Sequence, residues 1–350
     1  MGPPPAPTGG PASAALPGPV TAAATVHDVR VGRQAVYDTR YRLVSYELLF
    51  RDGRDRAAED SPDRATGEAA TSQVIAATFA TFGLDAVSAG KPVFINFTRG
   101  FLTGLLPIPV GPDLVIIEVT DQVRADRELL RGLTQLKGAG YRIVVDDYRG
   151  DPGRSPLVEL ADFVKIDVNA VATRALPRLV QACRLTGARL VASGVVDGDL
   201  LHQCADLGFE LFQGDHLDRP AVLERRVLSP SQLVCARLLS ELSQPNVSLT
   251  RLEQLVGSDP GLAIRLLRSA HSASGTGRPV ESLRQALVLI GPQRLRSWIV
   301  LTLLEGVATQ NASDELWNVL ARAHTCAGLA ALAAASPGVP QGDDQDAELG

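Results

Sequence analysis

Between residues 26 and 220, short apolar segments alternate with amphipathic stretches, and this alternation restricts the possible folds more than any other feature of the chain. Most of the apolar segments are continuous runs bounded by turn residues, which is typical of strands covered on both faces. Amphipathic helices are predicted between them, for example over 69–82 and 124–139. Repeated strand–helix units over this length favour a (β/α)8 barrel, with an open doubly wound sheet as the alternative. The segments predicted as strands are VRVGRQAVYD, LVSYELLF, PVFINF, LVIIEV, RIVVDD, FVKID, RLVASGV and ELFQG.

Residues 230–336 show a different pattern, with successive helices and no convincing strand. Thr250 and Glu253 predict a capping box, and Asp259, which precedes a proline, predicts the start of another helix. Gly291, also followed by proline, is expected to end a helix. This part of the chain is therefore predicted to be all-α.

The two patterns predict two domains, an α/β barrel over 26–225 and a helical domain over 230–336. Residues 1–25 are rich in proline, alanine and glycine, and residues 337–350 are polar and rich in turn formers. Such segments cannot bury enough apolar surface to order themselves, so we expect flexible tails at both ends.

Composition and charge exclude several classes of partner. The net charge is −5 and the isoelectric point is about 5.6, so no basic field would attract nucleic acid or an anionic membrane. The N-terminus lacks a secretory signal, and no apolar run reaches the roughly 18 residues that would span a membrane. The 4 cysteines form no C-x-x-C pair, which argues against zinc and disulfides. We expect a cytoplasmic protein that binds neither nucleic acid nor a membrane.

Polar side chains stand at or just after the C-terminal ends of the predicted strands. In a barrel of this type these ends converge on one mouth, where catalytic and binding residues collect. Any one of these residues could be a surface pair or a turn cap, but an ordered series of carboxylates favours a cation site. Oxygen ligands suit hard divalent cations, and a phosphodiester is a natural substrate beside them. The series is Glu47, Asn96, Glu118, Asp146, Asp147, Lys165 and Gln213.

The order and the amino-acid sequences of these segments resemble the EAL domain of cyclic-di-GMP phosphodiesterases over nearly all of residues 28–221. Within that family, the segments YELLFR, ATSQVI, FINFTRG and ALVLIG resemble the subgroup in which an EAL domain precedes an HDOD domain. The matching motifs are Glu47-x-Leu49-x-Arg51, Asn96, Glu118 to Asp121, Asp146-Asp147-Tyr148, Lys165-Ile166-Asp167, and Gln213-Gly214 with Pro220.

The resemblance implies a role for each matching residue. One divalent cation, Mg²⁺ or Mn²⁺, would be held by four residues, Glu47, Asn96, Glu118 and Asp146. A second cation would be held with the help of Asp147. Lys165 would orient the attacking water, and two further residues, Arg51 and Gln213, would contact the ligand, cyclic-di-GMP.

The chain departs from the family's pattern at several positions. Ser193 and Val196 stand where the family's E-G-V-E segment has acidic residues, and Asp121 stands where it has a glutamate. The loop that follows the paired aspartates reads DDYRGDPG instead of the family's D-F-G-T-G pattern. Two-metal catalysis needs both ions, so we expect the hydrolysis of cyclic-di-GMP to be impaired or absent. Any bound cation or catalytic role of Lys165 would then be vestigial.

The helical region resembles the first half of an HDOD module, through LVGSDPGLAIRLLRSAHSASG and ESLRQALVLIGPQRLRSW. It is expected to stop near residue 336, either as a naturally short module or as a fragment. A shortened module would leave apolar faces uncovered, foremost the segment 298–304. We expect such faces to pack on the barrel, on a second copy of the chain, or on a protein partner.

Three functions remain open. The favoured hypothesis is a bacterial signalling protein with a degenerate EAL domain that acts through protein–protein interaction. The second is a receptor that binds cyclic-di-GMP without hydrolysing it. The third is an active phosphodiesterase that depends on Mg²⁺ or Mn²⁺. Ser193 and Val196 separate the enzyme from the other two, which the sequence does not separate from each other.

Overall fold

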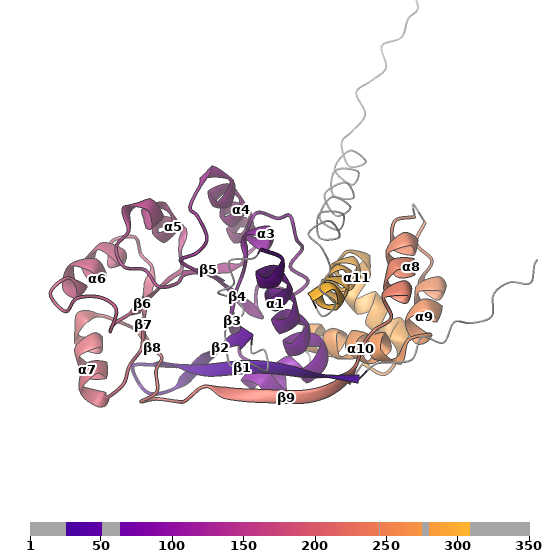
Figure 1. Ribbon diagram of the computed structural model, residues 1–350, viewed down its shortest axis with the longest axis horizontal. Coiled ribbons are helices and arrows are strands. Elements are labelled where there is room, and N and C mark those ends of the chain that lie inside the picture. Colours follow the sequence, from indigo (N-terminus) through magenta and orange to yellow (C-terminus); the bar gives the residue numbers. More distant parts are fainter. Residues whose placement is uncertain (1–25, 51–63, 245, 275–279, 309–350) are drawn as a thin grey trace, which may run out of the picture.

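The structure is a computed structural model that describes residues 26–50, 64–244, 246–274 and 280–308. It has two parts that lie side by side, a strand-rich part and a helical part, and a pair of long strands runs from one to the other (Figure 1). The predicted flexible tails lie outside the described residues, and so does Arg51, which is predicted to contact the ligand.

The strand-rich part is a closed barrel of eight strands, as the sequence predicts. The neighbours from β2 to β8 are parallel, but β1 is antiparallel to both β2 and β8. The barrel thus begins with a hairpin, and its closure depends on the first and the eighth strand. The strands are β1 (Val26–Asp38), β2 (Leu43–Phe50), β3 (Val93–Asn96), β4 (Val115–Val119), β5 (Arg142–Val145), β6 (Phe163–Asp167), β7 (Arg189–Ser193) and β8 (Leu211–Phe212).

Helices surround the barrel, and the helical part continues from it. The predicted helices over 69–82 and 124–139 correspond to α1 with η2 and to α4. The elements on the barrel are α1 (Arg64–Ala76), the π-helical segment η2 (Ala77–Phe82), α2 (Leu84–Ser88), α3 (Arg99–Leu102), α4 (Arg127–Gly138), the 3₁₀ turn η3 (Pro152–Arg154), α5 (Ser155–Leu160), α6 (Leu176–Arg184) and α7 (Gly198–Leu207). The helical part holds α8 (Gln232–Leu242), α9 (Leu249–Gly257), α10 (Pro260–Ser274) and α11 (Leu283–Ala308).

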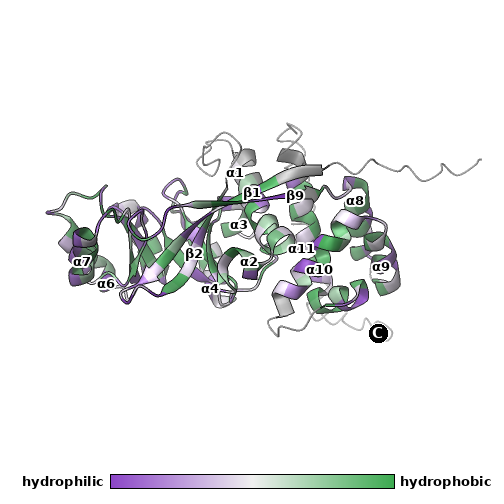
Figure 2. Ribbon diagram, turned by 90° about the horizontal axis from the view of Figure 1, so that it is seen from below, coloured by the Kyte–Doolittle hydropathy of each residue, from purple (hydrophilic) through white to green (hydrophobic). Residues whose placement is uncertain are grey.

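One strand was not predicted. β9 (Ala221–Leu228) pairs antiparallel with the first half of β1, outside the closed barrel. Its sequence, AVLERRVL, has no simple alternation of apolar and polar residues, so its periodicity did not identify a strand. The ribbon of β1 and β9 runs from the barrel to the helical part (Figures 1 and 2).

The inside of the barrel is filled by an apolar layer. Side chains alternate along a strand, so the residue two positions further on points to the same side. On each strand from β3 to β8, the residue two positions after the apolar one therefore also points inward. These residues form a second layer, nearer to the C-terminal ends of the strands. The apolar layer is Val36, Phe94, Ile116, Val144, Phe163, Val191 and Leu211.

The expectation that segment 298–304 is exposed is wrong. Trp298 is 9% exposed and Ile299 is fully buried. The reason is that α11 packs on α1 of the barrel as well as on α8, α9 and α10. The surfaces expected to bury this segment are the barrel, a second copy of the chain or a protein partner. The structure shows packing on the barrel.

In the part of the chain that the structure describes, Leu283–Glu305 is the one helical segment that is long and apolar enough to cross a membrane by length and composition. Gly291 has a φ of 74°, which interrupts this segment, as its Gly-Pro sequence predicts. With Ile299 and Leu301 fully buried against neighbouring helices, we interpret α11 as a core helix of the helical part.

The predicted helix starts have different outcomes. Asp259 is confirmed, because its Oδ1 accepts a hydrogen bond from Leu262 N at 2.9 Å at the start of α10. The capping box of Thr250 and Glu253 is wrong, because Ser248 caps α9 two residues earlier. Thr250 and Glu253 both contact Arg284 of α11 instead.

Gly132 should be sensitive to the smallest substitution. A Cβ at this position of α4 would lie 2.1 Å from Leu102 O and 2.9 Å from Thr103 Cα, both backbone atoms. We expect Gly132→Ala to lower the free energy of unfolding by about 1–3 kcal/mol, measured by urea denaturation. A Cβ at Gly138, in the same helix, would meet no atom within 4 Å, so Gly138→Ala is the matched control and should not destabilise. Equal effects of the two substitutions would contradict the close approach of α3 and α4.

Candidate functional site

Each strand of the barrel contributes one polar residue to a common inward layer above the apolar one. From β3 to β8 these residues follow the apolar layer by two positions, and on the antiparallel β1 Gln34 lies opposite Glu47 of β2. We call this layer the polar ring: Gln34, Glu47, Asn96, Glu118, Asp146, Lys165, Ser193 and Gln213. The ring confirms that most of the polar residues predicted at the strand ends lie together.

Lys165 is at the centre of the ring's contacts. Its Nζ lies 2.9 Å from Glu47 Oε2, 2.5 Å from Glu118 Oε1 and 3.5 Å from Asp146 Oδ1. Glu118 is fully buried, and Lys165 is 4% exposed. An ammonium group in contact with three carboxylates makes their burial possible, because an unpaired charge at this depth would be very unfavourable. We call these four residues the lysine cluster.

The ionisation of the lysine cluster is strongly perturbed. Burial and the charge of Glu47 raise the pKa of Glu118 well above its usual value. Burial raises the pKa of Asp146 to about 6, although Lys165 opposes the shift. Burial alone would lower the pKa of Lys165, but the neighbouring carboxylates raise it well above its usual value. Burial thus favours the protonated form of Glu118 and Asp146, and the charge of Lys165 opposes it.

Gln213 joins the lysine cluster to the first strand. Its Nε2 donates to Glu47 Oε2 at 2.5 Å and to Gln34 Oε1 at 3.1 Å. The residue after it must be glycine, because a Cβ at Gly214 would lie 2.2 Å from Val195 O. Gln34 was missed by sequence reasoning, which treated only the ends of strands; β1 is antiparallel, so its contribution to the mouth comes from its middle.

The donor set fits a hard divalent cation by its chemistry. Glu118 Oε2 is buried and accepts no hydrogen bond, which leaves a carboxylate oxygen available to an ion. In the described part of the chain, however, no three Asp, Glu, His or Cys side chains are grouped as a metal site requires. The carboxylates of the lysine cluster converge on Lys165 Nζ instead. A cation held here by Glu47, Glu118 and Asp146 would take over contacts that the ammonium now makes.

The second part of the candidate site is altered. Ser193 ends β7 and lies opposite Asp167 of β6 in the strand register. Val196, the other substituted position, is 59% exposed and faces away from the barrel interior. The polar ring therefore carries a neutral hydroxyl on β7, at the position where the EAL pattern has a carboxylate. Asp167 is the acidic residue nearest to Ser193 in the register.

Asp147 lies beside the lysine cluster and not in it. It follows Asp146 with a φ of 47°, a left-handed conformation that turns the chain away from the strand. Burial raises its pKa, and Lys165 partly opposes this shift. Asn96 lies opposite Glu118 in the register of β3 and β4, at the same end of the barrel. Its predicted role as a ligand, like that of Asp147, stays a prediction.

A buried arginine fixes the loop that follows Asp146. Arg154 is 7% exposed, and its guanidinium donates to the carbonyl oxygens of Val119, Thr120 and Asp146 at 2.9–3.1 Å. It thus joins the ends of β4 and β5. Sequence reasoning missed this residue, because it read the DDYRGDPG loop only as a departure from a pattern. The single available signal was an arginine close to several aspartates.

Both parts of the chain are similar to known families and proteins. The EAL domain family matches residues 84–220, and the HDOD domain family matches residues 228–345. Cyclic di-GMP phosphodiesterase CdgJ of Vibrio cholerae is 29% identical over 306 residues, which cover 86% of this chain and 70% of CdgJ. The uncharacterized protein YuxH of Bacillus subtilis is 27% identical over 295 residues, which cover 82% of this chain and 71% of YuxH.

Solved structures of EAL proteins are also similar. PaMucR phosphodiesterase in complex with c-di-GMP has a TM-score of 0.47 and 23% identity, covering 55% of this chain and 96% of that chain. BlrP1 of Klebsiella pneumoniae, with calcium and cyclic-di-GMP, has a TM-score of 0.46 and 21% identity, covering 61% and 64%. The two family matches follow each other in the order that the sequence predicts. The chain thus has an EAL domain followed by an HDOD domain, and it belongs to the EAL–HDOD proteins.

Proposed function

We propose that the EAL domain of this signalling protein binds cyclic-di-GMP together with a divalent cation and hydrolyses it slowly or not at all. Glu47, Glu118 and Asp146, with Asn96 beside them, would hold the cation. The bound cation would offset the carboxylates and attract the phosphates of the ligand. The occupied domain would then act on a protein partner or on a second copy of the chain.

The observation that carries this proposal is the composition of the polar ring. The ring retains the lysine cluster and Gln213, which would supply oxygen ligands for one cation and polar contacts to a ligand. On β7 it has Ser193, whose hydroxyl is a poor ligand for a second cation. Without that cation, the attacking water would lose both its activation and its in-line alignment.

Active hydrolysis is the alternative, and one observation favours it. CdgJ, a cyclic di-GMP phosphodiesterase by name, is similar to 86% of this chain. In this alternative, Asp167 would supply the carboxylate that Ser193 lacks, from the neighbouring position in the register.

Binding and hydrolysis can be separated with the purified full chain. We expect calorimetry to detect cyclic-di-GMP binding in millimolar Mg²⁺ and much weaker binding in EDTA, because a phosphodiester entering among carboxylates needs a cation. Chromatography of the same mixtures should show negligible linear dinucleotide with either Mg²⁺ or Mn²⁺. Glu118→Gln should abolish the cation-dependent part of the binding.

Robust turnover that is lost in Glu47→Ala would contradict the proposal and support the phosphodiesterase. Ser193→Glu is expected to restore little hydrolysis, because Val196 and the loop fixed by Arg154 remain altered. Glu224→Gln, which breaks an exposed pair with Arg30 on the β1–β9 ribbon, is the matched control and should bind as the native chain does.

Lys165 and a cation should compete for the same carboxylates. We expect Lys165→Met to lower the free energy of unfolding by about 3–5 kcal/mol, because three buried carboxyl groups lose their counter-charge. Millimolar Mn²⁺ should then raise the melting temperature of Lys165→Met more than that of the native chain. The control is Lys137→Met, which removes a half-exposed contact with Asp162 and should show no extra effect of Mn²⁺. An equal rise in all three proteins would rule out a cation within the lysine cluster.

A further inference from the structure

One continuous helical rod connects the mouth of the barrel with the HDOD domain. The rod consists of α1 and η2, residues 64–82. On the barrel side, α1 contacts β2 and β3, and Thr71 Oγ1 donates to the carbonyl oxygen of Asn96 at 3.0 Å. On the other side, α1 packs on α11, and η2 packs on α10. The rod thus touches a residue of the polar ring and two helices of the HDOD domain.

The end of the rod is wound as a π-helix, and this winding leaves polar atoms without partners. Gly83 N donates to Thr78 O, five residues earlier, at 2.9 Å. The hydroxyls of Thr78 and Thr81 are buried and make no hydrogen bond. In an α-helix each of them could donate to the carbonyl four residues before it. The same segment therefore has a second hydrogen-bonded form available, and contacts from outside must hold the present one.

Two arginines supply such contacts at the end of the π-helix. The carbonyl oxygen of Thr81 accepts Arg225 Nη1 from β9 at 2.8 Å and Arg268 Nη1 from α10 at 2.5 Å. The two cations thus share one acceptor, and burial together with the nearby charge of Arg225 lowers the pKa of Arg268. One of the two belongs to the ribbon that leaves the barrel, and the other to the HDOD domain.

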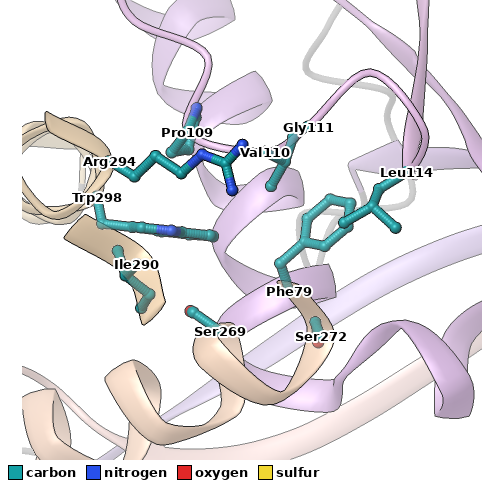
Figure 3. A pocket seen from close by; sticks show the side chains of 10 residues that line it. All are labelled: Phe79, Pro109, Val110, Gly111, Leu114, Ser269, Ser272, Ile290, Arg294 and Trp298. Atoms are coloured by element: carbon teal, nitrogen blue, oxygen red, sulfur yellow. The ribbon is translucent and has the colours of Figure 1, made fainter. Parts of the chain in front are cut away.

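The side chains around η2 form the rest of this contact. Phe79 of η2 and Val110 of the barrel line one side of a small cavity, and residues of α10 and α11 line the other (Figure 3). Trp298 of α11 lies in this wall with its ring toward the cavity (Figure 3). Trp298 is therefore placed to report on any change in the winding of η2.

We propose that the HDOD domain holds the rod in its π-wound form through Arg268, and that the rod couples the occupancy of the barrel mouth to the HDOD domain. The identity of the ligand, cyclic-di-GMP, rests on the proposed function. Rewinding η2 as an α-helix would rotate α1 against β3 and change the position of Asn96 through Thr71. Coupling of this kind is reciprocal, so the ligand would equally change the packing of α10 and α11.

The first test needs no ligand. Hydrogen exchange of the full-length Arg268→Gln variant should show faster exchange in η2 and also in residues 93–103, which include β3. The control is Arg284→Gln, which breaks a surface pair with Glu253 inside the HDOD domain and should leave residues 93–103 unchanged. If Arg268→Gln fails to fold, Arg225→Gln removes the other donor to the same carbonyl. Faster exchange confined to η2 and α10 would overturn the coupling.

The second test uses cyclic-di-GMP with Mg²⁺. The chain has 2 tryptophans, so Trp317→Phe leaves Trp298 as the only one. Ligand titration should shift the emission of Trp298 along the isotherm measured by calorimetry, and Thr71→Val should remove the shift while binding persists. Arg268→Gln should change the dissociation constant at least about fivefold, and Arg284→Gln should not.

The two proposals fail in different ways. Binding seen by calorimetry without any change at Trp298 or in the exchange of α10 and α11 overturns the coupling and keeps the proposed function. An absence of binding overturns the proposed function, and the hydrogen exchange of Arg268→Gln then decides the coupling alone.

Discussion

The contact of one ammonium with three carboxylates inside the barrel is the interaction on which the rest of the site depends. The apolar layer beneath it keeps water out, so the charges of Glu47, Glu118 and Asp146 require an internal partner, and Lys165 provides it. The same contact limits what the site can do. A cation that enters must compete with the ammonium of Lys165 for these carboxylates. Its binding free energy is therefore less favourable than at carboxylates without such a partner.

The two sides of the mouth differ in the side chains that they present. Around Lys165, strands β1 to β5 and β8 each present a side-chain oxygen that can bind an ion or accept a hydrogen bond. On β7 the ring has Ser193 in place of an acidic residue. The loop after Asp146, on the other side, is held by the cationic side chain of Arg154. Under the proposed function, such a site would recognise a ligand through one cation while the chemical step is slow.

Much of the barrel was predictable from the sequence, because continuous apolar runs and the residues at their ends follow from burial on both faces. Lys165, Glu118 and Gln213 were found for that reason. Gln34 was not found, because an antiparallel first strand reverses which of its residues meets the mouth. Two further features were not found. β9 pairs with a strand far away in the sequence, and Arg154 donates mainly to carbonyl oxygens more than thirty residues away. The burial of Trp298 depends on contact between the two domains, which periodicity does not describe.

The first strand has a consequence for how the chain is made. Val26 pairs with Leu228, and Asp38 pairs with Leu211, so β1 finds these partners only after the whole barrel has been synthesised. Pairings across so long a stretch of chain form slowly, and an unpaired edge is prone to wrong associations in the meantime. The ribosome therefore releases β1 long before it releases β8 and β9, the strands that pair with it. An isolated EAL domain produced without residues 221–228 would keep that edge open permanently.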